Sequence, residues 1–114
     1  MRLAALCLAA VLLSPAALAG TERCSEPFAP VIPDGVTATD EEIKESKREV
    51  EQFIADSDEY QACILAVIAD PDEKMTPEQK QAARRLIDDN QREKEDVAAA
   101  YKTARRAHKA AKAR

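Results

Sequence analysis

Length and composition confine the chain to a small class of proteins. It has 114 residues, 33% charged, 46% hydrophobic and only 4% aromatic, with a formal net charge of −4. Two glycines, Gly20 and Gly35, are too few for the clustered glycine loops that bind nucleotide phosphates. One histidine and the two cysteines outside the apolar N-terminal run, Cys24 and Cys63, cannot form a four-ligand structural zinc site unless carboxylates do most of the work. We therefore predict no metal and no other cofactor.

The first residues have the pattern of a secretory signal peptide spanning 1–19. Arg2 supplies a basic start, residues 3–13 are an unbroken apolar run, and residues 17–19 are Ala-Leu-Ala, the small-residue pattern that precedes a cleavage site. We predict cleavage after Ala19. The protein is then periplasmic or secreted, with no transmembrane segment in the mature chain.

Two alternatives to a cleaved leader remain. A membrane span needs about 20 apolar residues, and this run is interrupted by Ser14 and Pro15. A lipoprotein needs a cysteine directly after the apolar run. Cys7 lies inside the run instead, and Cys24 follows charged residues. Both features favour the cleaved signal peptide.

Cleavage leaves two cysteines, Cys24 and Cys63, and a net charge of −5 from 16 basic and 21 acidic side chains. An even number of cysteines in an exported chain indicates a disulfide bond between them. In the chain-entropy model, closing a loop of about 40 residues contributes on the order of 4 kcal/mol. The alternative is a pair of free thiols.

Capping signals predict where the first helix begins and ends. Thr39 followed by Glu42 is a capping box, in which each residue's side chain accepts a hydrogen bond from the other's backbone amide. Pro71 disfavours helical geometry at Asp70. We therefore predict a helix over about 40–69.

A second capping box predicts the second helix. Thr76 is its cap, Pro77 its first helical residue and Gln79 the partner of Thr76. We predict this helix over about 77–112. Because the connection is short, the two helices should form an antiparallel hairpin, an all-α fold that occupies 39–114.

The first predicted helix has an apolar seam of period 3.5, typical of a coiled coil. Its two series are Ile43, Val50, Ser57 and Ile64, and Ser46, Phe53, Tyr60 and Val67. Further apolar residues widen the seam to an arc of roughly 160°, which suggests two packing partners; they are Ile54, Leu65 and Ile68.

One face of the second helix is sparsely apolar. It contains Ala83, Leu86, Ile87, Asn90, Val97, Tyr101, Ala104, His108 and Ala111. An in-register hairpin pairs Tyr60 with Leu86 and Ile87. It also pairs Val50 with Val97 and Ile43 with Ala104, so we expect incompletely covered apolar surface near Ile43, Val50 and Val97.

The segment 20–38 is rich in proline and is predicted to be an extended strap. A polyproline-like run of about 15 residues spans about 46 Å, enough to run back along the first helix from a disulfide at Cys63 to Thr39. The predicted apolar anchors are Phe28, Val31, Ile32 and Val36. The alternative is a disordered Pro-rich linker.

Several polar residues are candidates for a chemical role. His108 has no second histidine or cysteine nearby, so we interpret it as structural or solvated. Asn90 either fixes the register as a buried amide or is exposed where the pairing thins. The grouped carboxylates are interpreted as a charged helix face; they are Asp56, Asp58, Glu59, Asp88 and Asp89.

Charge is unevenly distributed along the chain. Residues 22–96 carry 21 acidic and 10 basic groups, whereas residues 101–114 carry six basic groups and no acidic one. Five of them form a stripe that is a candidate polyanion-binding or membrane-surface site: Lys102, Arg105, Arg106, Lys109 and Lys112. The alternatives are stabilisation of the helix C-terminus by cations and pairing with acidic residues elsewhere.

A set of motifs between residues 24 and 64 resembles a family. They are Cys24-x-x-Pro27-x-x-Pro30-x-Ile32-Pro33-Asp34-Gly35, then Thr39 with Glu41-Glu42-Ile43, then Tyr60-x-x-Cys63-Ile64. In these motifs the chain is similar to a group of small uncharacterised exported helical proteins of Gram-negative proteobacteria. The resemblance implies a periplasmic or secreted helical protein and brings no activity.

These features lead to two functional hypotheses. The first is a non-enzymatic periplasmic or secreted protein that binds an envelope protein, associates with itself or has a structural role. The second is a polyanion or membrane-surface binder that acts through the basic stripe. Nucleic acid is not an expected partner. No nucleophile and base pair, metal-ligand set or cofactor loop is visible, so an enzyme ranks third.

Overall fold

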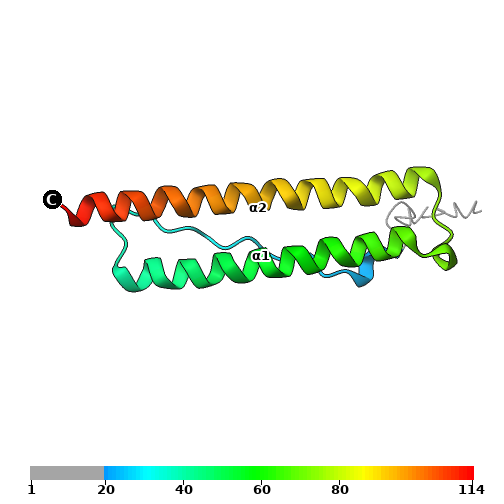
Figure 1. The fold of residues 1–114 in the computed structure, drawn as a ribbon, viewed down its shortest axis with the longest axis horizontal. Coiled ribbons are helices and arrows are strands. Elements are labelled where there is room, and N and C mark those ends of the chain that lie inside the picture. Colours follow the sequence, from blue (N-terminus) through cyan, green and yellow to red (C-terminus); the bar gives the residue numbers. More distant parts are fainter. Residues whose placement is uncertain (1–19) are drawn as a thin grey trace, which may run out of the picture.

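The fold is a pair of long helices joined by a short connection (Figure 1). The computed structural model describes residues 20–114, so the predicted signal peptide lies outside the described residues. The elements are the 3₁₀ helix η2 (Thr21–Arg23), the helix α1 (Asp40–Ala69), the 3₁₀ helix η3 (Pro71–Glu73) and the helix α2 (Pro77–Lys112). The long helices pack side by side along their length, which confirms the predicted all-α hairpin.

Both long helices begin at a capping box. The Glu42 amide donates to Thr39 Oγ1 at 3.1 Å, and the Thr39 amide donates to Glu42 Oε2 at 2.9 Å. Thr76 and Gln79 form the same reciprocal pair at 3.1 and 2.9 Å, with Pro77 at the first helical position. These bonds satisfy amides that a helix leaves unpaired at its start. The helices therefore begin where the capping signals predict.

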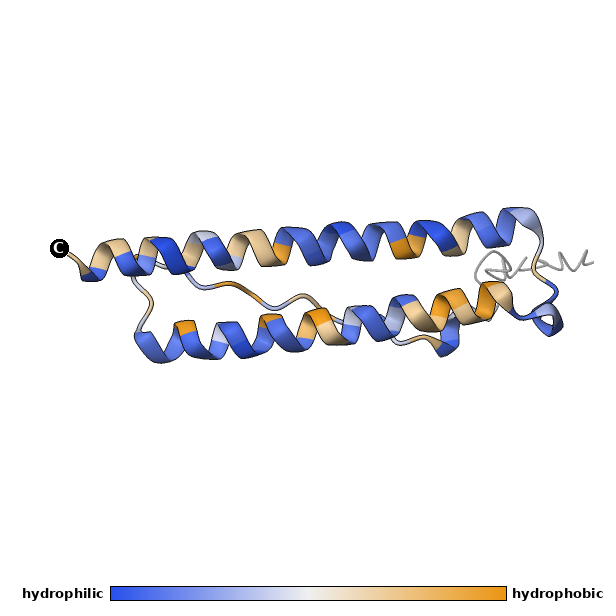
Figure 2. Ribbon diagram, in the orientation of Figure 1, coloured by the Kyte–Doolittle hydropathy of each residue, from blue (hydrophilic) through white to orange (hydrophobic). Residues whose placement is uncertain are grey.

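Burial along α1 follows the predicted seam. Its eight buried residues are the members of the two series described above, which together recur every 3.5 residues from Ile43 to Val67. Buried residues on α2 also recur every seven positions, at Ala83, Asn90, Val97 and Ala104. Figure 2 shows that α2 is hydrophilic over most of its length, whereas α1 is most hydrophobic near the connection.

The core consists of two clusters. The first, next to the connection, contains buried Cys24, Tyr60, Ile64, Val67 and Ala83, with neighbours that include Leu86 and Ile87. The second, about halfway along the hairpin, contains buried Val50, Phe53 and Val97, with Ile32, Ile54 and Tyr101 packed against them. Tyr60 therefore shares a cluster with Leu86 and Ile87. Val50 likewise shares one with Val97, as in-register pairing predicts.

A polar layer lies between the two clusters. Asn90 is only 4% exposed, and its Nδ2 donates to Ser57 Oγ at 3.2 Å. Its Oδ1 accepts a hydrogen bond from Gln61 Nε2 at 2.9 Å. Of the two alternatives for Asn90, the buried one is therefore correct. Because a shifted alignment of the helices would leave this amide without partners in a buried position, the layer favours the observed register.

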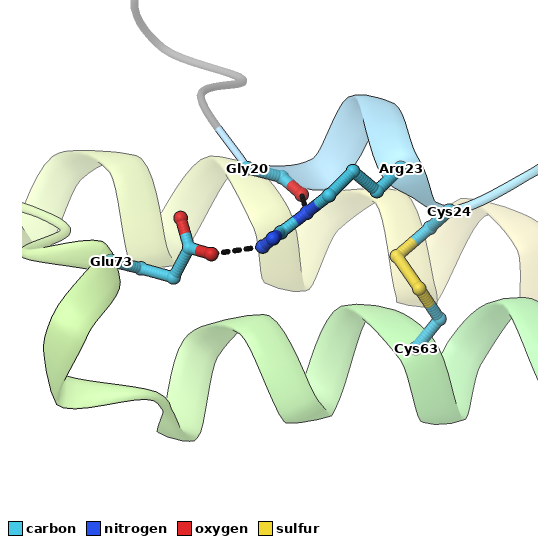
Figure 3. Close-up of a disulfide and its surroundings, with 5 residues drawn as sticks. All are labelled: Gly20, Arg23, Cys24, Cys63 and Glu73. Carbon is cyan, nitrogen blue, oxygen red and sulfur yellow. Dashed lines mark hydrogen bonds and ion pairs between the residues drawn. A yellow bond between two sulfur atoms is a disulfide. The ribbon is translucent and has the colours of Figure 1, made fainter.

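The Pro-rich segment is tied to α1 and lies along both helices. Cys24 and Cys63 form the predicted disulfide, with their Cα atoms 5.6 Å apart (Figure 3). From Cys24 the chain continues without helix or strand over 25–34 and runs back towards the start of α1 (Figure 1). Ile32 packs against the second cluster. Gly35 is buried so close to α2 that an added Cβ would lie 2.7 Å from the carbonyl carbon of Ala104.

Three of the four predicted apolar anchors of this segment are wrong. Phe28 is 96%, Val31 90% and Val36 64% exposed, and of the four only Ile32 is packed against the core. Burial repeats every three residues here, as in a polyproline helix. The three prolines between 27 and 33 are half-buried, whereas Phe28 and Val31, also three apart, face solvent. A segment with three residues per turn cannot direct all four side chains at the helices.

Candidate functional site

Four basic side chains gather on the last third of α2. Because a helical turn holds 3.6 residues, positions three and four apart share a face. In the structure the side chains line one surface hollow of about 290 Å³, and we call them the basic cluster; they are Lys102, Arg105, Arg106 and Lys109. Four of the five residues of the predicted stripe therefore line this hollow together.

The basic cluster is not neutralised by the rest of the described chain. Within residues 20–114, no carboxylate lies within 4 Å of any of its four charged groups. The basic side chains of α1 differ, since Lys44, Lys47 and Arg48 each pair with a carboxylate one turn away on the same helix, for example Lys44 with Glu41 at 3.7 Å. Neighbouring like charges repel each other, so an anion in the hollow relieves that repulsion.

Lys112, the fifth member of the predicted stripe, has a partner on α1. Its Nζ lies 2.9 Å from Asp40 Oδ1 and 3.0 Å from Oδ2. His108 Nε2 lies 2.6 Å from the same Oδ1. Hydrogen bonds from Lys112 and, second, from His108 lower the pKa of the Asp40 carboxyl below its usual value. This trio, which we call the clasp, joins the start of α1 to the end of α2.

The contacts of Asp40 with His108 and Lys112 were not among the predicted ones. His108 is buried, with 9% exposure, and pairs with Asp40. This agrees with the interpretation of His108 as a structural residue. A signal for the contact was available. Because Ile43 was paired with Ala104, continuing the antiparallel register by about one turn places position 40 opposite position 108.

The side chains of Ile43, Val50 and Val97, near which uncovered apolar surface was expected, are buried, which corrects that prediction. Ile43 is 9%, Val50 4% and Val97 8% exposed. Ile32 of the Pro-rich segment packs against the cluster that holds Val50 and Val97. The Ile32 side chain therefore covers apolar surface that the sparsely apolar face of α2 does not cover. The prediction considered only the pairing of the two helices and did not include this contact.

Among residues 20–114, the most exposed large apolar side chains lie on the Pro-rich segment instead. Phe28 and Val31 share its outward side. Phe28 also borders a hollow of about 570 Å³ between this segment and α1, together with Pro27, Pro30, Glu49, Gln52, Phe53 and Asp56. Its lining combines proline and aromatic surface with two carboxylates. An apolar group next to a positive charge fits that combination.

The grouped carboxylates behave as a charged helix face. Asp58 accepts from Lys94 at 2.5 Å and Asp56 from Gln52 at 2.8 Å. Across residues 20–114, no three His, Cys, Asp or Glu side chains are close enough together to hold a metal ion. None of the helices described is both long and apolar enough to cross a bilayer. In comparisons with known proteins, no family model, curated protein or solved structure matches the chain.

Proposed function

We propose that this chain is a small non-enzymatic protein of the bacterial envelope, exported through its leader, cleaved after Ala19 and acting by binding. The disulfide supports export, because such bonds persist in oxidising compartments. N-terminal sequencing of the protein recovered from the periplasmic fraction should give Gly20 as the first residue. An intact chain that still begins at Met1 and stays in the cytoplasm would contradict export.

The binding surface with the best support is the basic cluster, and the chemistry it fits is an anionic surface. The observation that carries this proposal is four neighbouring cations in one hollow, with no carboxylate of residues 20–114 in ion-pair range. Each basic group near an anionic bilayer contributes about 1 kcal/mol. Because the opposite face of this helix is mostly alanine, the contact is electrostatic and not an insertion.

Vesicle binding tests the basic cluster. The mature oxidised protein should bind vesicles that contain phosphatidylglycerol, should not bind purely zwitterionic vesicles, and should lose affinity steeply as salt is raised. Replacing all four residues by Gln should weaken binding by up to about 1,000-fold, since four groups contribute about 4 kcal/mol in total. Soluble heparin as a competitor distinguishes a general polyanion site from one that needs a bilayer.

A matched control removes the same number of charges elsewhere. Lys44, Lys47, Arg48 and Arg92 each pair with a carboxylate one turn away, so replacing these four by Gln gives the same net charge. This control should retain most of the binding. Equal loss in both variants would mean that overall charge drives binding, and unchanged binding in the cluster variant would remove the proposal.

Exposure of the outward side of the Pro-rich segment supports a second candidate function, the binding of a protein partner. Phe28 and Val31 are almost fully exposed, which is uncommon for large apolar side chains that lie close together. The hollow beside Phe28 offers apolar walls with the carboxylates of Glu49 and Asp56. A partner side chain with an apolar body and a cationic end matches this chemistry. Self-association through the same surface is the other form of this candidate.

Site-specific crosslinking in the envelope tests this candidate. A photoreactive residue in place of Phe28 should give one discrete crosslinked product. In place of Leu65, an apolar residue of α1 that is 54% exposed, it should not. A product with twice the mass of the chain would indicate self-association. Absence of a product at position 28, or the same products at both positions, would contradict partner binding by this segment.

A further inference from the structure

The first described residue, Gly20, occupies a position that favours glycine. Its φ of +89° lies in the left-handed region that side chains disfavour. An added Cβ would also lie 2.7 Å from Glu73 Oε2 and 3.0 Å from Val67 Cγ1. The backbone at Gly20 is buried and therefore pressed against the end of α1 and against η3.

Glu73 already holds one cation next to Gly20. Figure 3 shows its Oε1 paired with the guanidinium of Arg23, whose Nε donates to the Gly20 carbonyl at 3.4 Å. The Glu73 side chain is only 21% exposed. Its other oxygen, Oε2, is the one nearest Gly20. One carboxylate thus faces both Arg23 and the backbone of Gly20.

Cleavage after Ala19 changes the charge at this position. Water hydrolyses the Ala19–Gly20 peptide bond, its oxygen joining the Ala19 carbonyl carbon and a hydrogen joining the Gly20 nitrogen. The new carboxyl group loses a proton, and the new α-amine takes one up, because its pKa is ordinarily about 7.7–8.0. The Gly20 nitrogen is bonded to the same Cα that would carry the Cβ. It therefore lies within about 5 Å of Glu73 Oε2.

We propose that Glu73 is the binding site for the α-ammonium group that signal-peptide cleavage creates at Gly20. The processed chain gains a network of Gly20, Glu73 and Arg23 that fastens its new N-terminus to η3. The precursor lacks it, because an amide nitrogen in a peptide bond carries no charge. This inference rests on the cleavage site in the proposed function.

The pKa of the Gly20 α-amine tests the proposal directly. A chain produced with its N-terminus at Gly20 is folded, oxidised and titrated by NMR or by the rate of amine acylation. The α-amine pKa should be about one unit above its value in the same chain in denaturant, with acylation at pH 7 slower by about tenfold. Glu73→Gln should abolish both effects. Glu22→Gln, which removes an exposed carboxylate of the same segment, should leave them intact.

A second variant should change the α-amine pKa in the direction opposite to Glu73→Gln. Arg23→Gln removes the cation that shares the Glu73 carboxylate, so the α-amine pKa should rise further. The proposal is overturned if the pKa in the folded wild type equals that in denaturant, or if Glu73→Gln leaves a raised pKa unchanged. These outcomes concern a chain that starts at Gly20 by design. Failure of export, seen as a different N-terminus in cells, is therefore distinguished from failure of the Glu73 site.

Discussion

Gly35→Ala tests whether the Pro-rich segment is seated against α2. The new methyl group would lie 2.7 Å from the carbonyl carbon of Ala104 and 2.9 Å from its Cα, and nearer still to the carbonyl oxygen. These are backbone atoms of α2, so they cannot turn aside as a side chain does. The segment itself would have to lift away from α2.

The expected cost follows from what the lifted segment loses. Forcing an extra methyl group into a packed site typically costs about 1–3 kcal/mol. Lifting the segment to avoid that strain exposes Ile32, which is half-buried, so this route costs part of the ~1.5–3 kcal/mol that full burial of such a side chain contributes. We therefore expect the free energy of unfolding to fall by about 1–3 kcal/mol. If the segment were not seated against α2, the free energy of unfolding should rise instead. Gly→Ala at an unstrained position stabilises a protein by about 0.4–1 kcal/mol, because it reduces the conformational entropy of the unfolded chain.

Urea denaturation of the oxidised chain that begins at Gly20, followed by circular dichroism, measures this change. Val36→Ala is the matched control, since Val36 is adjacent and 64% exposed; its effect should stay within about 0.5 kcal/mol. Gly35→Ala should also lower Tm by about 4–8 °C for each kcal/mol lost. A Gly35→Ala protein as stable as the wild type, or more stable, would refute the seated arrangement.

Two other substitutions probe the polar contacts between the helices. Asn90→Ala leaves Ser57 Oγ buried without its donor and should cost about 1–3 kcal/mol in urea denaturation; a neutral effect would contradict the polar layer. For the clasp, the pKa of Asp40 is lowered in the folded chain, so its stabilisation is present above the unfolded value of about 3.9 and is lost as pH falls through the lower folded value. Asp40→Asn should therefore weaken the loss of Tm between pH 5 and pH 2. An identical acid profile in both proteins would argue against the clasp.

The parts of the fold that depend on local or periodic signals were predictable from the sequence. A capping box is read within four residues, which is why both helix starts agree with the structure. The seam of α1 has eight buried positions, and matching its large side chains to those of α2 predicts the register. Only two cysteines follow the predicted leader, so their pairing in an exported chain had one solution.

Features that depend on contacts between distant residues were not predictable in the same way. A segment without internal hydrogen bonds has no fixed facing, so the sequence did not reveal that Ile32 points inward while Phe28 and Val31 point outward. The contact between Asp40 and His108 joins positions 68 residues apart, so it follows from the register of the two helices and not from any local signal. The partner of Lys112 also emerges only when the two helix ends are placed together.

The central claim is that one intramolecular disulfide fixes the Pro-rich segment to the hairpin. Peptide mapping of the protein from the periplasm, digested without reducing agent and analysed by mass spectrometry, tests it most directly. The account predicts one linked peptide pair that contains Cys24 and Cys63, recovered from monomeric protein. Two unmodified thiols, or a bond that joins two separate chains, would contradict it.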